Sequence, residues 1–311
     1  MNTLDQKGVF NGIVDKRAFF DRVALSIWGN KRRPSKNVSV QTNKPIGGKG
    51  RAYARAERGT LRTGIAYELR YGLSGVKRFM PPMMLILRSE PSPLTAIDTV
   101  TAVRALCGNV SRASISEVEL AFDLSRISVA FFRQRILSSA RTFTQIPADR
   151  ETKTLYIRGR KAPWQLRIYA KSPTVTRFEY VLRSAYLRKV GINTPLDLVT
   201  VRHLPLSSLV MLRELDEAAF RKVVAQLPEL QGRVVRSFRR NLTLQDFLRA
   251  TRDTLKLPES AFLEPAIAKR LEKMQQRLLY DPYFPCTPLR RVRDRDRNNP
   301  PSWRIGLQPV S

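Results

Sequence analysis

The sequence predicts an α+β fold, in which a mostly antiparallel sheet carries helices on one face and an all-helical C-terminal region follows. Two observations lead to this prediction. Before Gly191, segments with apolar residues at every second position outnumber helical ones, and three of these predicted strands follow one another without an intervening helix. After Gly191, the apolar residues recur at helical spacing.

The N-terminal part of the chain combines strands with a basic segment. A first strand is predicted over residues 19–28, where Val23, Leu25 and Ile27 share one face at a period of two. Residues 31–70 hold eleven basic residues against two acidic ones, and the stretch PIGGKGRAY among them indicates a flexible basic loop. Strands are predicted to resume in GIAYELRYGL and MMLILRS.

Two helices are predicted in the middle of the chain. SPLTAIDTVTAVRALCGN begins with Ser92 as a cap and ends at Gly108, and SRISVAFFRQRILSSA follows a predicted strand, SISEVELAFDL. Three strands come next, in KTLYIRG, WQLRIYAK and VTRFEYVLR. The clearest C-terminal helices are predicted in LDEAAFRKVVAQLPEL, LTLQDFLRATRDTL and AIAKRLEKMQQRLL.

The charge of the chain predicts a polyanionic partner. The 311 residues include 56 Lys and Arg against 26 Asp and Glu, a formal net charge of +30, beside a hydrophobic content of 42%. A folded protein with such a surplus of cations repels itself, and a nucleic acid is the simplest partner that would offset the repulsion. The alternative is that the cations only keep the protein soluble.

The content of histidine and cysteine limits the chemistry. One histidine, His203, and two distant cysteines, Cys107 and Cys286, exclude a zinc cluster and a disulfide framework. Any metal site is therefore built from carboxylates, which suits Mg²⁺ or Mn²⁺. The chain has neither a membrane-length apolar run nor the apolar core of a signal peptide, so we expect a cytoplasmic protein without membrane association.

Alternation along the predicted strands places acids, tyrosines and cations on one sheet face. Val118, Leu120 and Phe122 are expected to face the core, so the acidic residues beside them face the other way. The same reasoning for the later strands gives a set on that outer face: Glu117, Glu119, Asp123, Tyr156, Arg158, Arg167, Tyr169, Lys171, Arg177 and Glu179. An ordinary solvated face with cross-strand ion pairs is the alternative.

Carboxylates gathered among cations are typical of a divalent-metal site that faces a phosphate. We expect Glu119, Asp123 and Glu179 to hold Mg²⁺ or Mn²⁺. A tyrosine beside such a site can attack a phosphodiester and keep the cleaved DNA as a phosphotyrosine.

Tyr169 is expected to be this nucleophile, and Tyr156 on the adjacent strand is the alternative. Lys171 and Arg167 would lower the pKa of the phenol and neutralise charge in the transition state.

The segment TLYIRGRKAPWQLRIYAK, followed by TRFEYVLR, resembles the hairpin of rolling-circle replication initiators of the plasmid Rep_trans type and the related phage gene II type. Their pattern is roughly Tyr-Ile-Gly-Ser-Arg, a short gap, Arg-Ile-Tyr-Asp-Lys and then Arg-x-Glu. SEVELAFDL resembles their upstream strand, usually Arg-x-Asp-x-Ala-x-Asp, and LRSAYLRKVGINTPLDL resembles the helix and turn that follow. The resemblance covers roughly residues 80–200.

The resemblance implies a nicking-joining enzyme with a strand tyrosine as nucleophile and acids as metal ligands. Tyr169 matches the tyrosine of Arg-Ile-Tyr-Asp-Lys, Glu179 the acid of Arg-x-Glu, and Glu119 and Asp123 the two upstream acids. The chain departs from the pattern at three places: Arg158-Gly159 replaces Gly-Ser, Ala170 replaces the Asp after the tyrosine, and Glu117 replaces the upstream Arg.

Together, these observations predict three parts of the chain: a catalytic α+β core over residues 1–200 with the basic loop at 31–70, a helical DNA-binding or accessory region over 201–286, and a disordered basic tail over 287–311. The residues expected to grip DNA are Lys31, Arg32, Arg33, Lys36, Lys49, Arg51, Arg158 and Arg160.

The predicted function is initiation of rolling-circle replication of a phage or plasmid in a bacterial host, by a sequence-directed endonuclease and strand transferase. Its partner would be origin DNA, single-stranded or cruciform, and a host helicase and a second copy of the chain are further candidates. Two alternatives stay open: a non-catalytic nucleic-acid-binding protein, and a metal-dependent nuclease that uses water.

Overall fold

The computed structural model describes residues 14–29, 38–46, 52–73, 80–91, 94–129, 136–138, 142–145, 154–209, 212–214 and 266–279. All of them belong to one compact unit, Met1–Leu279, and a second unit, Tyr280–Ser311, lies outside the described residues. The predicted tail at 287–311 and the predicted helices between residues 215 and 265 therefore stay predictions.

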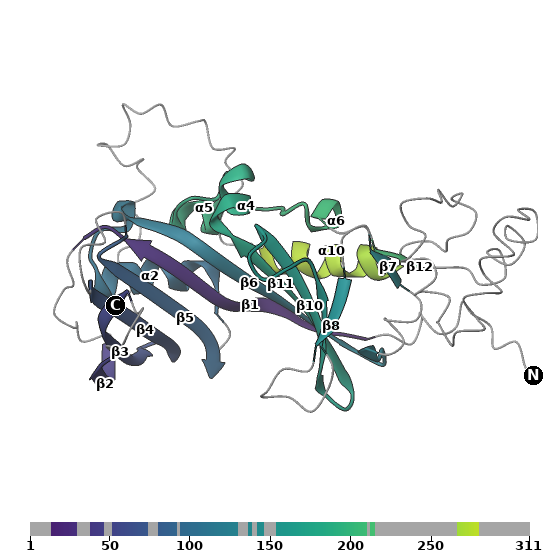
Figure 1. The fold of residues 1–311 in the computed structure, drawn as a ribbon, viewed down its shortest axis with the longest axis horizontal. Coiled ribbons are helices and arrows are strands. Elements are labelled where there is room, and N and C mark those ends of the chain that lie inside the picture. Colours follow the sequence, from purple (N-terminus) through teal and green to yellow (C-terminus); the bar gives the residue numbers. More distant parts are fainter. Residues whose placement is uncertain are drawn as a thin grey trace, which may run out of the picture. The chain divides into compact units, whose positions relative to one another are not determined.

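A single antiparallel sheet of ten strands dominates the fold, in the order β2-β3-β4-β5-β1-β6-β11-β10-β9-β8 (Figure 1). The strands are β1 (Val14–Ile27), β2 (Val38–Pro45), β3 (Tyr53–Leu61), β4 (Ile65–Leu73), β5 (Met83–Pro91), β6 (Ala113–Ser125), β8 (Thr142–Gln145), β9 (Thr154–Ile157), β10 (Trp164–Ser172) and β11 (Val175–Arg183). Long β1 and β6 pair at the centre, so the two ends of the sheet are joined through them.

A few helices accompany this sheet: α2 (Ala96–Leu106), the 3-10 turn η1 (Val110–Arg112), α4 (Ser184–Lys189), α5 (Pro195–Thr200), α6 (Leu206–Leu209) and α10 (Ala266–Leu279). Capping boxes start α2 at Thr95 and α5 at Thr194. Helix α2 therefore begins three residues later than the Ser92 cap predicted from the sequence. None of the helices in the described ranges is both long and apolar enough to cross a membrane.

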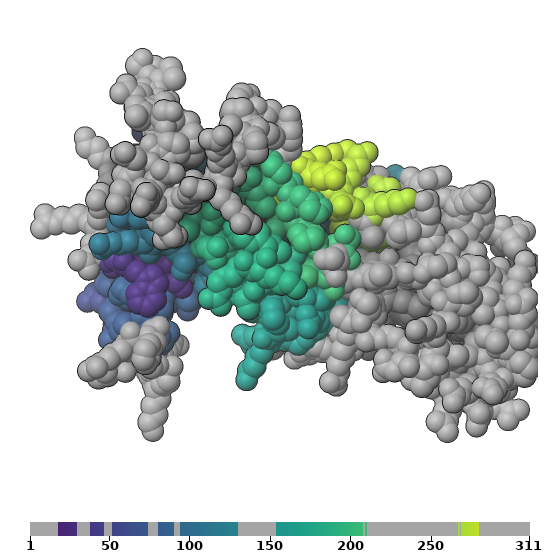
Figure 2. All heavy atoms as spheres, turned by 90° about the horizontal axis from the view of Figure 1, so that it is seen from above, coloured from purple at the N-terminus to yellow at the C-terminus, as the bar shows by residue number. Residues whose placement is uncertain are grey.

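The apolar face of the sheet forms the core with these helices. Phe20, Phe122 and Phe178 of the central strands belong to one buried cluster that also contains Leu187 of α4 and Leu271 of α10. Figure 2 shows α10 in yellow beside the green segment that includes α5 and α6. Two hydrogen bonds, from Gln275 to the Leu204 carbonyl and from Arg202 to the Leu279 carbonyl, tie α10 to that segment.

The strands predicted in GIAYELRYGL, MMLILRS, SISEVELAFDL, KTLYIRG, WQLRIYAK and VTRFEYVLR are confirmed, as are the helices around α2 and α10. The interpretation of residues 31–70 as a loop segment is wrong for 38–45 and 53–61, which form β2 and β3. A second error concerns β7 (Ile136–Ser138), predicted as helix, which pairs with β12 (Leu212–Glu214) in a region predicted to be all helical.

Gly59 of β3 is expected to be intolerant of a side chain. A Cβ there would lie 2.0 Å from the carbonyl oxygen of Ser39 in β2 and 2.9 Å from the Tyr67 hydroxyl. Since the Ser39 oxygen is backbone, Gly59→Ala should lower the free energy of unfolding by about 1–3 kcal/mol. Chemical denaturation measures this, with Gly159→Ala as the control because its Cβ would meet nothing within 4 Å. Equal losses in both variants would contradict the prediction.

Candidate active site

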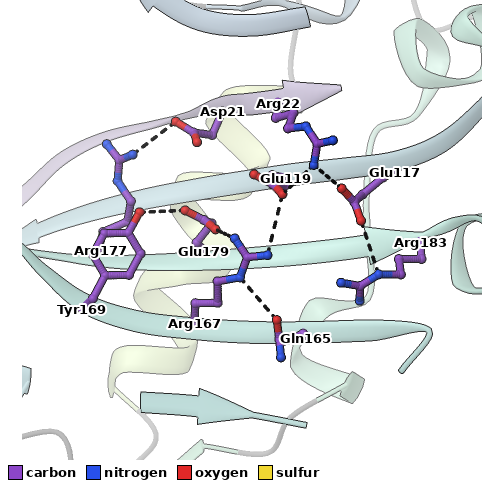
Figure 3. Close-up of polar contacts among 10 residues, drawn as sticks. All are labelled: Asp21, Arg22, Glu117, Glu119, Gln165, Arg167, Tyr169, Arg177, Glu179 and Arg183. Carbon is purple, nitrogen blue, oxygen red and sulfur yellow. Dashed lines mark hydrogen bonds and ion pairs between the residues drawn. The ribbon is translucent and has the colours of Figure 1, made fainter. Parts of the chain in front are cut away.

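The register of the strands brings the predicted site residues together on the face of the sheet opposite the apolar core. One row across the sheet joins Glu179 of β11, Arg167 of β10 and Tyr156 of β9. The next row joins Asp123 of β6, Arg177 of β11 and Tyr169 of β10. The prediction that these side chains share one face is confirmed, and Figure 3 shows those of β10 and β11 beside further polar side chains from β6 and β1.

Tyr169 lies at the centre of this cluster. Its hydroxyl donates a hydrogen bond to Oε2 of Glu179 at 2.7 Å, while Oε1 of the same carboxylate accepts one from Nη1 of Arg167 at 2.6 Å (Figure 3). Glu179 is thus fixed by two neighbours, one on each oxygen. A carboxylate in hydrogen-bond contact with a phenol is placed to accept its proton.

The cluster is more enclosed than the sequence predicted. The side chains were expected on an outer face, but Tyr169 is only 5% exposed, and Asp123 and Glu179 are each 3% exposed. The more open members are Asp21, Arg167 and Lys171, whose side chains are 27%, 28% and 36% exposed.

Three carboxylates, Asp21, Glu119 and Glu179, form a cluster that could hold a metal ion, with one ligand oxygen of each lying within 4.8 Å of the others. We call it the carboxylate triad. Two of its members were predicted from the sequence, but Asp21 was not. Hard oxygen ligands of this kind suit Mg²⁺, Ca²⁺ or Mn²⁺.

A β-bulge explains why Asp21 was missed. Phe20 pairs with Leu120 and Arg22 pairs with Glu119, so Asp21 is an extra residue in β1. Phe20 and Val23 both enter the core, and the two residues between them lie on the polar face. Strict alternation would place Asp21 on the same face as Val23. The break in that alternation at FFDRV was the only feature of the sequence that could have indicated that Asp21 lies on the polar face.

Asp123, the third predicted metal ligand, has a different role in the structure. The guanidinium of Arg177 binds it with two hydrogen bonds, Nε to Oδ1 at 2.7 Å and Nη2 to Oδ2 at 3.0 Å. Both residues are nearly fully buried, and Arg177 also reaches Oδ1 of Asp21 at 3.1 Å. Asp123 is on the predicted face, but it is not one of the three carboxylates whose oxygens lie within 4.8 Å of one another.

Arginines neutralise the carboxylate triad. Arg22 binds Glu119 at 3.2 Å, and Nη2 of Arg167 lies 3.8 Å from the same oxygen. Burial raises the pKa of Glu119, and the nearby charge of Glu179 raises it further, against the opposing effect of the two arginines. Burial alone would lower the pKa of Arg167, but the carboxylates of Glu179 and Glu119 raise it above its ordinary value. Arg167 therefore remains a cation within the cluster.

Lys171 and Tyr156 lie at the edge of the cluster. Nζ of Lys171 is 4.0 Å from Oδ2 of Asp123 and 5.8 Å from the centre of the Phe19 ring, and Arg177 stacks on the same ring at 4.8 Å. Tyr156 is half-buried beside Arg167. The structure thus brings every predicted catalytic residue to the same face, and both Tyr169 and Arg167 donate hydrogen bonds to Glu179 of the triad.

The reversed charge at Glu117, where the resembling pattern has arginine, has neighbours that balance it. Arg22 from β1 and Arg183 from β11 both bind Glu117, the second at 3.3 Å (Figure 3). Arg22 also contacts Glu119, so a guanidinium from the neighbouring strand stands beside the upstream acids. Although Glu117 stands where the resembling pattern has arginine, Arg22 still supplies a cation next to the triad.

The hairpin between β9 and β10 contains two residues predicted to bind DNA. Arg158 has a φ of 69° and lies 4.7 Å from the centre of the Trp164 ring, and its carbonyl accepts a hydrogen bond from Gln165. The resembling pattern has glycine here, which adopts positive φ without strain. Arg160 is exposed in the turn. The other six predicted DNA-binding residues, between Lys31 and Arg51, lie outside the described ranges.

Comparison with known proteins adds no assignment. Neither a protein-family model nor a curated protein sequence matches the chain.

Proposed function

We propose that the protein is a DNA nicking-joining endonuclease that initiates rolling-circle replication of a phage or plasmid in the cytoplasm of a bacterial host. The contact between the Tyr169 hydroxyl and Glu179, itself a member of the carboxylate triad, is the observation that carries the proposal. A tyrosine bonded to a proton acceptor, next to acids that can hold a metal and arginines that can bind a phosphate, is what a phosphotyrosine mechanism needs.

In the proposed reaction, the Tyr169 oxygen forms a bond to the phosphorus of one DNA strand, and the phosphorus–oxygen bond to the neighbouring sugar breaks. The phenolic proton passes to Glu179, which is 2.7 Å away. The released sugar oxygen takes up a proton from solvent. Because the ester is transferred and not hydrolysed, the phosphotyrosine keeps the bond energy needed for rejoining.

Neighbouring cations would stabilise the charge that builds up on the phosphate during attack. Arg167 lies beside Glu179 and is partly exposed, and Lys171 approaches from the next row of the sheet. Mg²⁺ or Mn²⁺ held by Asp21, Glu119 and Glu179 would add Lewis-acid polarisation of the phosphate.

A metal-dependent nuclease that uses water is the second candidate. The low exposure of Tyr169 favours it, because a buried tyrosine bonded to a carboxylate is also typical of a packing role. In that case the triad would activate a water molecule, and no covalent intermediate would form.

Covalent capture distinguishes the candidates. The protein is incubated with Mn²⁺ and an end-labelled single-stranded oligonucleotide that carries the origin of its own replicon, and the products are separated under denaturing conditions. A label that migrates with the protein supports the proposal. Cleaved DNA without an adduct supports the water-using nuclease, and binding with neither product supports a non-catalytic DNA-binding protein.

Cleavage is expected to require a divalent ion bound by the carboxylate triad. Asp21→Asn should raise the Mg²⁺ concentration needed for cleavage by more than the roughly 10–100-fold typical of residues that only orient a metal ligand. Glu117→Gln is the matched control, because it removes a carboxylate of the same face outside the triad. Equal metal dependence in the Asp21 variant and the wild type, or full cleavage in excess chelator, would contradict the assignment.

A further inference from the structure

The face that carries the candidate active site continues across the other half of the sheet. Arg58 of β3 pairs with Glu68 of β4, and Glu68 pairs with Ile86 of β5. Ile86 in turn pairs with Ala24 of β1, and Ala24 with Glu117 of β6. In the adjacent row, Arg88 of β5 pairs with Arg22. The same face of the sheet therefore extends from β3 to β10, with the buried residues Ile86 and Ala24 between its two polar parts.

Three arginines stand on the β3–β5 part of this face: Arg58, Arg70 and Arg88, which we call the arginine surface. Arg58 and Arg70 bind opposite oxygens of Glu68 through their Nε atoms, at 2.8 Å and 2.5 Å. Burial raises the pKa of Glu68, but the hydrogen bonds and charges of the two arginines outweigh it and lower the pKa below its usual value. Glu68 therefore stays ionised and fixes both guanidinium groups.

This arrangement presents the arginines for a further acceptor. Within the described part of the chain, the bonds to Glu68 use only Nε, so among these residues the terminal nitrogens of both guanidinium groups have no partner of their own and can meet another ligand. The side chain of Arg58 is 64% exposed and that of Arg70 is 38% exposed, and Arg88 is exposed beside them. Fixed, exposed guanidinium groups are suited to bidentate binding of phosphate oxygens.

We infer that the arginine surface binds the sugar-phosphate backbone of a single DNA strand on its way to Tyr169, an inference that rests on the proposed function. A single strand fits better than a duplex, because the Tyr169 hydroxyl is enclosed between side chains of neighbouring strands. From β4 to β10 the strand order gives five steps, or about 24 Å at roughly 4.8 Å each. At about 3.4 Å per nucleotide, at most about seven nucleotides span this distance.

The composition of the surface supports a phosphate ligand over mere solubility. A solubilising cation needs no partner to hold it, yet Glu68 is nearly buried and orders two arginines at once. The three arginines outnumber this one acid, so the surface stays cationic. Its charge complements a DNA backbone and joins that of Arg22 at the edge of the active site.

The test measures the salt dependence of binding to labelled oligothymidylate of 20 nucleotides by fluorescence anisotropy. The triple variant Arg58→Ala/Arg70→Ala/Arg88→Ala should reduce the slope of log affinity against log salt by about 2 units, since each lost phosphate contact removes about 0.7 on a single strand. The control variant Arg104→Ala/Arg188→Ala/Lys189→Ala removes the same charge from exposed positions of α2 and α4, and its slope should stay within about 0.7 of the wild type.

The single variant Arg88→Ala tests the inference even if the triple variant misfolds. It leaves the ion pairs of Glu68 intact and should still reduce the slope by about 0.7. An equal loss of slope in the triple variant and the control would overturn the inference. So would a loss of slope that is seen only after the oligonucleotide has been annealed to its complementary strand, and not with the single strand. Covalent capture is measured separately on the same proteins. An adduct with an unchanged slope would refute the arginine surface alone, and a reduced slope with no adduct in the wild type would refute the proposed function alone.

Discussion

Tyr169→Phe should abolish the covalent protein–DNA adduct. The substitution removes the only atom of this side chain that can bond to phosphorus, so no slower covalent route through Tyr169 remains. The fold should be preserved, because the Glu179 carboxylate keeps its hydrogen bond from Arg167 when the phenol is lost. Affinity for DNA should fall by no more than about tenfold, the range expected for one lost hydrogen bond among many contacts. Denaturing electrophoresis measures the adduct, and anisotropy measures the affinity.

Two further tyrosine variants make this experiment specific. Tyr71→Phe changes a half-buried tyrosine of β4 that bonds to Asn43, away from the candidate site, and should leave the adduct unchanged. Tyr156→Phe tests the neighbouring tyrosine on β9. An adduct that persists in Tyr169→Phe but disappears in Tyr156→Phe would transfer the role of nucleophile to Tyr156.

Arg177→Met should be the most destabilising change in the site. It leaves Asp123, 3% exposed, without its bidentate partner, and Lys171 at 4.0 Å is too distant to donate a hydrogen bond in its place. Breaking a buried ion pair by removing one partner costs about 3–5 kcal/mol. Chemical denaturation gives the free energy of unfolding. Removing the second charge as well, in Arg177→Met/Asp123→Leu, should recover part of the loss.

Arg183→Met is the matched control on the same strand. Its partner Glu117 is 19% exposed and keeps a second arginine, Arg22, so the loss should be only about 0–1 kcal/mol. Similar losses in the free energy of unfolding for Arg177→Met and Arg183→Met would show that the buried Asp123 pair contributes no more to stability than the more exposed Glu117 pair.

The sequence predicted strands well where one face is apolar and the other polar. Strands β6, β10 and β11 have this alternation, and all were predicted close to their observed bounds. Strand β2 was missed because nearly every side chain in it is exposed, as an edge strand of the sheet permits. Strand β7 was missed because its partner β12 follows more than 70 residues later, and local periodicity carries no information about so distant a pairing.

The candidate site was predicted as a face but not as a set of bonds. Alternation places Glu119, Tyr169 and Glu179 together, because residues two apart in a strand point the same way. Alternation does not reveal which carboxylate each arginine will bind. Asp123 and Asp21 both contact Arg177, yet only Asp21 joins the triad. That outcome depends on side-chain conformations and on the extra residue in β1.

The third carboxylate of the triad, Asp21, is present because β1 contains one extra residue at its bulge. Without Asp21, Phe20 and Val23 would be separated by Arg22 alone, and the regular in-out alternation would continue through a core that loses no apolar residue. One codon thus separates a sheet with two acids at this place from a sheet with three. A single insertion could therefore add a third potential metal ligand to this face without rebuilding the protein around it.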